Sequence, residues 1–419
     1  MRGLKPLALQ CSAGVVLMAV ALVSTAQEVQ PEHAGLSSER LTRINALVDR
    51  YIEQGDISGA VTLVARNGQI VHLEAQGVMD LESQTPMRTD TLFRIASMSK
   101  PVAGVAIMML VEEGKIRLRD PVSRFLPSYE GAQVGMAKGG AQSGGGFGGP
   151  PPEFYTVPAE RDITVRDLLT HTSGVMSGRI SNSVGRAMSS KRHEAGLAWV
   201  DELGSAPLEF QPGSRWAYSA LAGFDVLSRI VELVSGQRFE EFLDERIFEP
   251  LGIEDATFWP SPEQRERLVS SYTRGENGLE PRQNPDSMSG PNYSSGAGGL
   301  MITAEAYGRF GMMLANGGEL DGVRLLSPRT IELMGSAHIP DSLPGRPAGE
   351  GYGLSVRVVT DPVTRDTFLS EGSFGWSGAY GTHFWADPKE NLVGVLMIQT
   401  PIRGMRPEFE DAVMQAVVD

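Results

Sequence analysis

The residues Ser97-Met98-Ser99-Lys100 combine a hydroxyl and an amine at a spacing that suits nucleophilic catalysis. They stand where a polar stretch passes into an apolar run beginning at Pro101, which is typical of the first turn of a helix. Residues three apart share a helix face, so we expect the Lys100 amine beside the Ser97 hydroxyl. Burial and the helix dipole would both favour a neutral amine, which can take the serine proton. Alone, the pattern also fits a helix cap followed by a solvated lysine.

Two further segments carry groups that could complete such a site. Tyr218, in the segment 216–220, precedes a predicted helix. A tyrosine there is usually a packed ring, but next to a lysine it can hold or relay a proton. The segment 372–381 is rich in glycine and precedes a predicted strand. Its backbone could approach a substrate closely and present an amide to a reacting carbonyl, or it could be a simple turn.

Composition and charge narrow the class of protein. The chain has 419 residues, of which 41% are hydrophobic and 21% are charged, as in an ordinary globular enzyme. Its formal net charge of −14 argues against a nucleic-acid surface. The six histidines show no metal-ligand spacing, so neither a metal nor another cofactor is expected. The expected partner is a small molecule.

The N-terminus predicts export. Arg2 and Lys5 precede the apolar stretch 13–23, and small residues follow at 24–26. This pattern indicates a secretory signal over residues 1–26, with an uncleaved anchor as the alternative. The single cysteine, Cys11, lies inside that segment, so the mature chain would lack thiols. We therefore expect a periplasmic or secreted protein with no stable membrane anchor after cleavage.

Periodicity and turn signals predict an α+β fold. One antiparallel sheet, built from N- and C-terminal strands and flanked by helices, would carry an inserted, mostly helical region. We expect a single catalytic domain over 27–419, with an α/β part at 27–96 and 290–419, a helical part at 97–289 and a Gly/Pro-rich loop at 131–152. The predicted helices are 37–54, 165–170, 194–203, 221–234, 304–314, 327–334 and 407–417, and the predicted strands are 60–65, 69–75, 352–359, 367–370, 380–385 and 392–399.

The ordered set of motifs resembles the serine beta-lactamase-like superfamily, in particular its class C beta-lactamase and family VIII carboxylesterase branch. Besides the motifs above, the resemblance includes the segments 166–174, 295–300, 317–322 and 385–388, and it covers most of the mature chain. It implies Ser97 as the nucleophile and Lys100 and Tyr218 as the base and acid. It also implies an oxyanion hole from the amides of Ser97 and Ala379. His171, in segment 166–174, would hold a loop by hydrogen bonds.

Two departures from the lactamase pattern favour the esterase branch. Ala220 stands where the Tyr-x-Asn motif has its amide, which removes a substrate hydrogen bond of about 1–3 kcal/mol. Trp376 stands before Ser377-Gly378, where the third motif usually has Lys or His. Without that cation we expect no recognition of a substrate carboxylate, and Trp376, Ser377 and Gly378 would bind a neutral group. The sequence therefore predicts an exported serine hydrolase that cleaves carboxylic esters, with short-chain esters expected, through an acyl-enzyme on Ser97.

Several alternatives stay open. The chain could be a beta-lactamase, a D-amino-acid-peptide hydrolase or an acyltransferase, and a non-catalytic penicillin-binding-like module belongs to a different class. The segment 375–379 also nearly matches the Gly-x-Ser-x-Gly motif of other hydrolases, which would make Ser377 the nucleophile. The match fails at its last position. The segment also precedes a predicted strand instead of leading from a strand into a helix.

Overall fold

The computed structural model describes residues 30–140, 150–283 and 286–419. The predicted signal segment 1–26 and residues 141–149 of the predicted Gly/Pro-rich loop lie outside these described residues. Within the described ranges, no helix has the length and apolar character needed to cross a membrane.

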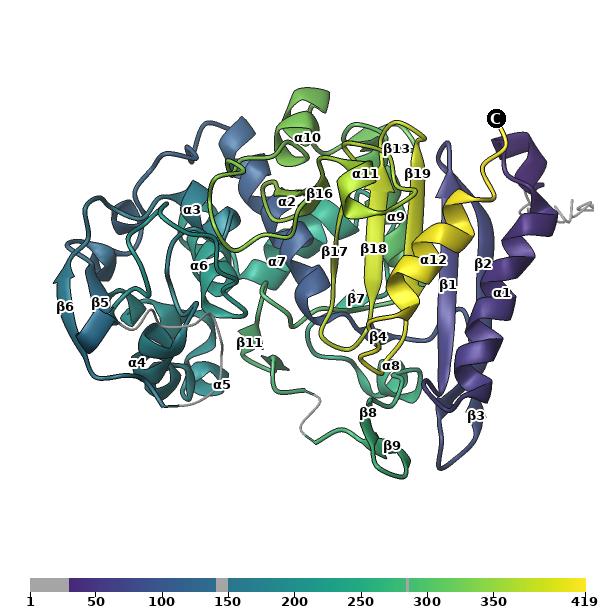
Figure 1. Cartoon of the computed structure of the whole chain (residues 1–419), viewed down its shortest axis with the longest axis horizontal. Helices are drawn as coiled ribbons and strands as arrows, with labels where there is room; N and C mark the ends of the chain where they lie inside the picture. The colour runs from purple at the N-terminus through teal and green to yellow at the C-terminus, as the bar shows by residue number, and fades with distance from the viewer. Residues whose placement is uncertain (1–29, 141–149, 284–285) are drawn as a thin grey trace, which may run out of the picture.

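Strands from both ends of the chain form one eight-stranded antiparallel sheet in the order β15-β16-β17-β18-β19-β1-β2-β3 (Figure 1). Strand β1 pairs with β19, with Val61 opposite Met397 and Arg66 opposite Leu392. This arrangement confirms the predicted α+β fold class. The strands are β1 (Gly59–Arg66), β2 (Gln69–Asp80), β3 (Thr85–Pro86), β15 (Glu350–Tyr352), β16 (Arg357–Val359), β17 (Phe374–Ser377), β18 (His383–Asp387) and β19 (Leu392–Met397).

Helices cover both faces of this sheet. On one face lie α1 (Ser38–Glu53) and α12 (Met405–Met414), and on the other lies α9 (Ala304–Ala315), as Figure 1 shows. The apolar stripe of α1 is buried, and Ser37 caps the helix by accepting the Arg40 amide. Because both faces are covered, every residue of β1 is buried.

The chain between β4 (Phe93–Arg94) and β12 (Met301–Ile302) contributes helices on one side of the sheet. Helix α2 (Ser99–Glu112) is buried from its first residue to Leu110 and is therefore a central core element. The other helices are α3 (Val165–Leu169), α4 (Arg179–Ser189), α5 (Arg192–Ala195), α6 (Ala222–Ser235), α7 (Phe239–Leu243), α8 (Pro262–Glu266), α10 (Pro328–Met334) and α11 (Pro362–Arg365). The remaining short strands are β5 (Gln133–Ala137), β6 (Phe154–Pro158), β7 (Ala256–Thr257), β8 (Tyr272–Gly275), β9 (Gly278–Pro281), β10 (Ser289–Gly290), β11 (Tyr293–Ser294), β13 (Glu319–Leu320) and β14 (Val323–Arg324).

Several predicted elements are wrong in detail. The predicted helix 194–203 is interrupted at Gly196, whose φ of 61° breaks the helical backbone. The predicted strand 352–359 is two strands, β15 and β16, separated by a turn in which Ser355 has φ 71°. The predicted strand 367–370 is a turn in which the Thr367 hydroxyl accepts the Leu369 amide. Part of the predicted loop 131–152 forms strand β5, which pairs with β6.

The glycine-rich segment itself contains a strand that the sequence did not predict. Strand β17 pairs with β18, with Gly375 opposite Trp385 and Ser377 opposite His383. A Cβ at position 375 would lie 2.1 Å from the Phe384 carbonyl oxygen, so only glycine fits this contact. The predicted strand 380–385 begins at His383 because residues 378–382 form the turn between the two strands.

Candidate active site

Ser97 lies in a 3₁₀ turn, Ala96–Met98, directly before α2 and not inside the helix. The turn is strained, because Ala96 has φ 44°, a value that residues with a side chain rarely adopt. Surrounding contacts hold it: the Tyr307 hydroxyl donates to the Met98 carbonyl at 2.9 Å. Because these contacts hold the turn in one conformation, they fix the position of Ser97.

Lys100 reaches the Ser97 hydroxyl from the first turn of α2. Its Nζ lies 3.4 Å from Ser97 Oγ, 2.8 Å from the Ala220 carbonyl oxygen and 2.7 Å from the Ala297 carbonyl oxygen, and the residue is 0% exposed. An ammonium would donate to all three oxygens. A neutral amine would donate to the two carbonyls and direct its lone pair at Ser97. The same three oxygens therefore fix the position of the Lys100 side chain beside Ser97.

Tyr218 closes the other side of the Ser97 hydroxyl. Its hydroxyl donates to Ser97 Oγ at 2.6 Å, and its ring centroid lies 5.0 Å from Lys100 Nζ. The structure thus brings together Ser97, Lys100 and Tyr218, which are up to 121 residues apart in the chain. Three groups that can exchange a proton meet at one oxygen.

His171 positions the tyrosine segment and does not contact Ser97 in the structure. Its Nδ1 accepts the amide of Ser219 at 3.1 Å, and its ring packs 4.7 Å from that of Tyr218. Burial, and secondarily the charge of Lys100, holds the pKa of His171 well below its usual range. A neutral imidazole is what this hydrogen bond requires, in line with the loop-holding role that the resemblance implied.

Ala379 is brought toward Ser97 by the turn that follows β17. A Cβ at position 378 would lie 2.2 Å from the Ile95 carbonyl oxygen, so Gly378 lets the turn approach the segment leading to Ser97. The Thr382 hydroxyl donates to the same carbonyl at 3.2 Å and secures the contact. Ser97 and Ala379 both line one cavity of about 630 Å³. This volume is in the range of small-molecule sites.

Trp376 and Ser377 also line this cavity but belong to different surroundings. Trp376 joins a group of aromatic rings, with its centroid 5.7 Å from that of Tyr218 and 5.3 Å from that of Tyr352. Ser377 Oγ lies 2.8 Å from His383 Nδ1, a contact that sequence reasoning did not find. The last two residues of β17 thus place one apolar and one polar group at the cavity.

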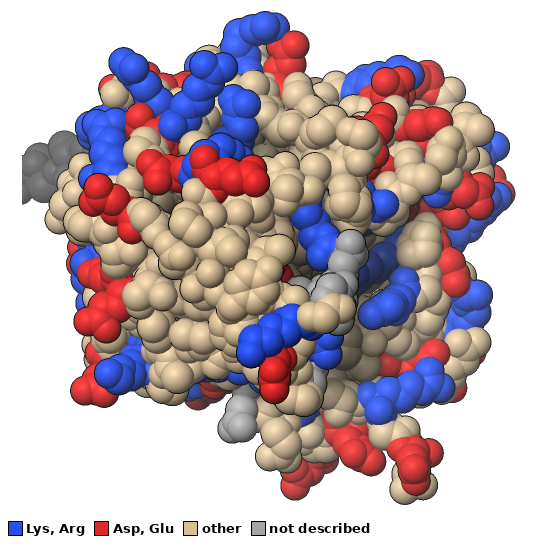
Figure 2. All heavy atoms as spheres, turned by 60° about the vertical axis from the view of Figure 1, so that its left-hand side comes forward, with Lys and Arg blue, Asp and Glu red and all other residues tan. Residues whose placement is uncertain are grey.

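The cavity is lined by cations even though the third motif lacks its usual Lys or His. Four arginines line it: Arg346, Arg357, Arg403 and Arg406. Figure 2 shows Lys and Arg side chains gathered around a hollow on one face, in a chain whose net charge is −14. The arginines follow no motif and come from segments far from Trp376 in sequence, so the composition of the third motif alone could not reveal them.

Arg406 is a partly buried cavity arginine with few compensating contacts. Its Nη2 donates to the Gly378 carbonyl at 3.0 Å, while its buried Nε has no partner among the described residues. No carboxylate in the described ranges lies within ion-pairing distance of it. Burial and the charges of Arg357 and Arg403 lower the pKa of Arg406. A bound anion or a carbonyl oxygen would relieve this unbalanced charge.

A buried carboxylate stabilises the loop that holds Lys100. Asp225, 0% exposed, accepts hydrogen bonds from Tyr293, from Ser295 at 2.6 Å and from Trp199 at 3.0 Å. Burial raises the pKa of the Asp225 carboxyl, and these hydrogen bonds oppose the rise. Ser295 lies two residues before Ala297, whose carbonyl contacts Lys100, so Asp225 fixes that carbonyl from behind. Among the described residues, no group of His, Cys, Asp or Glu could hold a metal ion.

The fold and site define the class of protein. The model of the family described as Beta-lactamase matches residues 44–418, and the chain belongs to this family. It is a member of the serine hydrolase superfamily, and its relatives include esterases.

Three relatives illustrate the relationship. Protein Rv1367c of Mycobacterium tuberculosis is 37% identical over 368 residues, covering 84% of this chain and 88% of that protein. Esterase EstB of Burkholderia gladioli is 30% identical over 420 residues, covering 94% and 99%. Among solved structures, EstCE1, a hydrolase with promiscuous acyltransferase activity, is similar with a TM-score of 0.74 and 26% identity, covering 91% and 99%.

Proposed function

We propose that this protein hydrolyses carboxylic esters through an acyl-enzyme on Ser97. The observation that carries the proposal is the convergence on Ser97 Oγ of the Tyr218 hydroxyl at 2.6 Å and Lys100 Nζ at 3.4 Å, at the wall of the cavity. A serine needs such a neighbouring base before it can attack a carbonyl. The esterase relatives support the choice of an ester over other acyl compounds.

The steps follow from these groups. Lys100 and Tyr218 take the Ser97 proton as Oγ attacks the ester carbonyl, and the amides of Ser97 and Ala379 stabilise the oxyanion. Tyr218 then protonates the departing alcohol, which leaves an acyl group on Ser97. Water, deprotonated by the same pair, releases the acid and restores the serine. All of these roles are parts of the proposal, and no step in it uses a cofactor.

Ala220, which stands where the Tyr-x-Asn motif has asparagine, favours esters over beta-lactams. Its carbonyl still holds Lys100, but its side chain offers no amide to a substrate acylamino group. The missing hydrogen bond is worth about 1–3 kcal/mol, or about one to two decades in rate. We therefore expect slow turnover of chromogenic cephalosporins beside that of p-nitrophenyl butyrate.

A side-by-side assay tests the proposal. Rates are measured with p-nitrophenyl butyrate, a chromogenic cephalosporin and a D-alanyl-D-alanine peptide, together with the intact mass of the enzyme shortly after mixing. The expected result is fastest turnover of the ester and an acyl mass increment that the Ser97→Ala chain lacks. Preferred turnover of the cephalosporin or the peptide would contradict the proposal, as would ester turnover without dependence on Ser97.

We also propose that residues 1–26 are removed on export to the periplasm or the medium. The basic residues, apolar stretch and small residues of this segment support the proposal. N-terminal sequencing of the protein from its native host tests it. A mature chain that begins near residue 27 is expected, and an intact Met1 would contradict it.

A further inference from the structure

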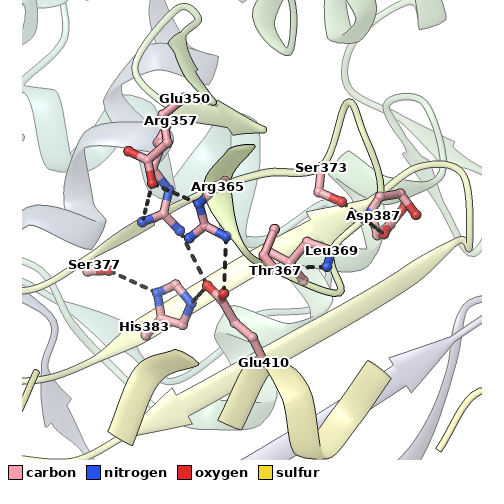
Figure 3. Close-up of polar contacts among 11 residues, drawn as sticks. Glu350, Arg357, Arg365, Thr367, Leu369, Ser373, Ser377, His383, Asp387 and Glu410 are labelled. Carbon is pink, nitrogen blue, oxygen red and sulfur yellow. Dashed lines mark hydrogen bonds and ion pairs between the residues drawn. The ribbon is translucent and has the colours of Figure 1, made fainter. Parts of the chain in front are cut away.

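Ser377, His383 and Glu410 form a hydrogen-bonded chain that runs from the cavity into the interior (Figure 3). Ser377 Oγ lies 2.8 Å from His383 Nδ1, and His383 Nε2 lies 2.9 Å from Glu410 Oε1. Ser377 and His383 face each other across strands β17 and β18, and Glu410 comes from α12. The proposed hydrolytic mechanism uses none of these three side chains.

The inner end of this chain is a fixed negative charge. Arg357 and Arg365 each place a guanidinium nitrogen 3.4 Å from a Glu410 oxygen. Although burial opposes it, the hydrogen bond from His383 and the charges of these arginines hold the pKa of Glu410 below its usual range. Burial lowers the pKa of His383, and the hydrogen bond and charge of Glu410 oppose this shift without cancelling it. At neutral pH the pair is therefore an ionised Glu410 and a neutral His383, which are 3% and 0% exposed.

This charge state fixes the direction of both hydrogen bonds. An ionised carboxylate only accepts, so His383 must carry its one proton on Nε2 and donate it to Glu410. His383 Nδ1 is then a bare acceptor, and the partner that can donate to it is the Ser377 hydroxyl. A serine has a single O–H. With that hydrogen committed to His383, Ser377 presents only its oxygen lone pairs to the cavity.

We propose that Ser377 is a fixed hydrogen-bond acceptor for the substrate, and that the natural ester carries a neutral O–H or N–H donor that lies against it. The proposal rests on the proposed esterase function and names the substrate class for that site. An ammonium donor does not fit, because the four arginines that line the same cavity outnumber its one lining carboxylate, Glu350, and would repel it. A hydroxyl or an amide suits both the acceptor and the neighbouring guanidinium donors. His383 and Glu410 are positioning residues.

The first experiment reads the His383 tautomer without any turnover. The full chain is labelled with ¹⁵N-histidine, and long-range proton–nitrogen spectra are recorded at neutral pH. The His383 signals are assigned by their loss in His383→Gln, or by their shift in Ser377→Ala if the first variant does not fold. A protonated Nε2 with a bare Nδ1 is expected. A proton on Nδ1, alone or together with Nε2, would overturn the proposal, even in a chain that hydrolyses esters well.

The second experiment measures whether the cavity prefers a donor. Two matched ester pairs are used: hydroxyethyl and methoxyethyl butyrate vary the alcohol side, and methyl hydroxybutyrate and methyl methoxybutyrate vary the acyl side. Dissociation constants are measured on the Ser97→Ala chain, so binding is read even if turnover is absent. If the substrate hydroxyl donates one neutral hydrogen bond to Ser377, the hydroxy member of at least one pair should bind about five- to tenfold more tightly than its methoxy partner.

Variants on the Ser97→Ala background assign that preference to Ser377. Adding Ser377→Ala should reduce the ratio to within about twofold, and Ser377→Thr should retain it. Ser373→Ala is the matched control: Ser373 is a buried serine that donates to Asp387 at 2.8 Å, also seen in Figure 3, and it does not line the cavity. It should leave the ratio unchanged. Equal binding of both members of each pair, or a preference that survives Ser377→Ala, would overturn the proposal.

Discussion

The cavity contains two serines, Ser97 and Ser377, whose replacement by alanine separates two possible nucleophiles. Ser97→Ala removes the oxygen on which Lys100 and Tyr218 converge, so both remaining groups lose the atom they would activate. Loss of a nucleophile whose partners act as a unit removes most of the catalysis. We expect kcat/KM for p-nitrophenyl butyrate to fall by at least about three decades, equivalent to about 4 kcal/mol of transition-state stabilisation.

Ser377→Ala should cost much less. The variant loses one hydrogen bond to a neutral imidazole and leaves His383 Nδ1 without that partner, which costs about 1–3 kcal/mol. The corresponding loss in kcat/KM stays below about two decades. Initial rates with p-nitrophenyl butyrate are compared for both variants, and thermal melting checks that each is folded. The assignment is refuted if Ser377→Ala abolishes turnover while Ser97→Ala retains it.

Four further outcomes follow from the contacts. Lys100→Ala should lower ester turnover about as much as Ser97→Ala, and Tyr218→Phe should also be severe; unchanged rates in either variant would contradict the roles assigned to them. Arg406→Gln should lower kcat/KM for p-nitrophenyl hemiglutarate, relative to kcat/KM for p-nitrophenyl butyrate, by about tenfold. The reason is the lost charge-assisted contact between Arg406 and the hemiglutarate carboxylate. An unaltered ratio would exclude this role. Asp225→Ala leaves three buried donors without an acceptor and should lower the free energy of unfolding in urea by about 3–5 kcal/mol. A loss under about 1 kcal/mol would contradict the stabilising role of this carboxylate. Because the folded-state pKa of Glu410 lies below its ordinary 4.5, at about 2, its ionised form stabilises the fold above pH 4.5, and this contribution is lost as the pH falls toward 2. Glu410→Gln should flatten that acid dependence of the unfolding free energy, and an equally steep dependence in the variant would contradict the cause.

Signals that are local in the chain predicted the framework of the fold. The Asn67-Gly68 pair joins β1 and β2 with φ values of 55° and 75°, as a tight hairpin requires. The apolar spacing of α1 and the cap at Ser327 each depend on residues within one or two turns. These features appear in a single sequence because the interacting residues are neighbours along it.

Features that depend on distant segments were not predictable from the sequence. Strand β17 has two favourable aromatic residues, but it requires a glycine at position 375 because the Phe384 carbonyl of β18 lies directly against that position. The cavity arginines Arg357 and Arg406 come from a strand and a helix with no motif of their own. Their place beside Trp376 follows from sheet order, which composition does not specify.

The near match to Gly-x-Ser-x-Gly shows why such a motif needs its structural context. Ser377 contacts an imidazole that is backed by a carboxylate, which is the order of groups in a serine triad, although the two ring nitrogens are exchanged. In hydrolases with that motif, however, the serine stands at a strand-to-helix turn, and the amide of the following residue binds the oxyanion. Here Ser377 ends a strand, and the amide of Gly378 already donates to the Thr382 carbonyl at 2.8 Å. Without that donor, attack by Ser377 would leave its oxyanion short of a stabilising hydrogen bond. The chain of contacts therefore suits a fixed acceptor better than a second nucleophile.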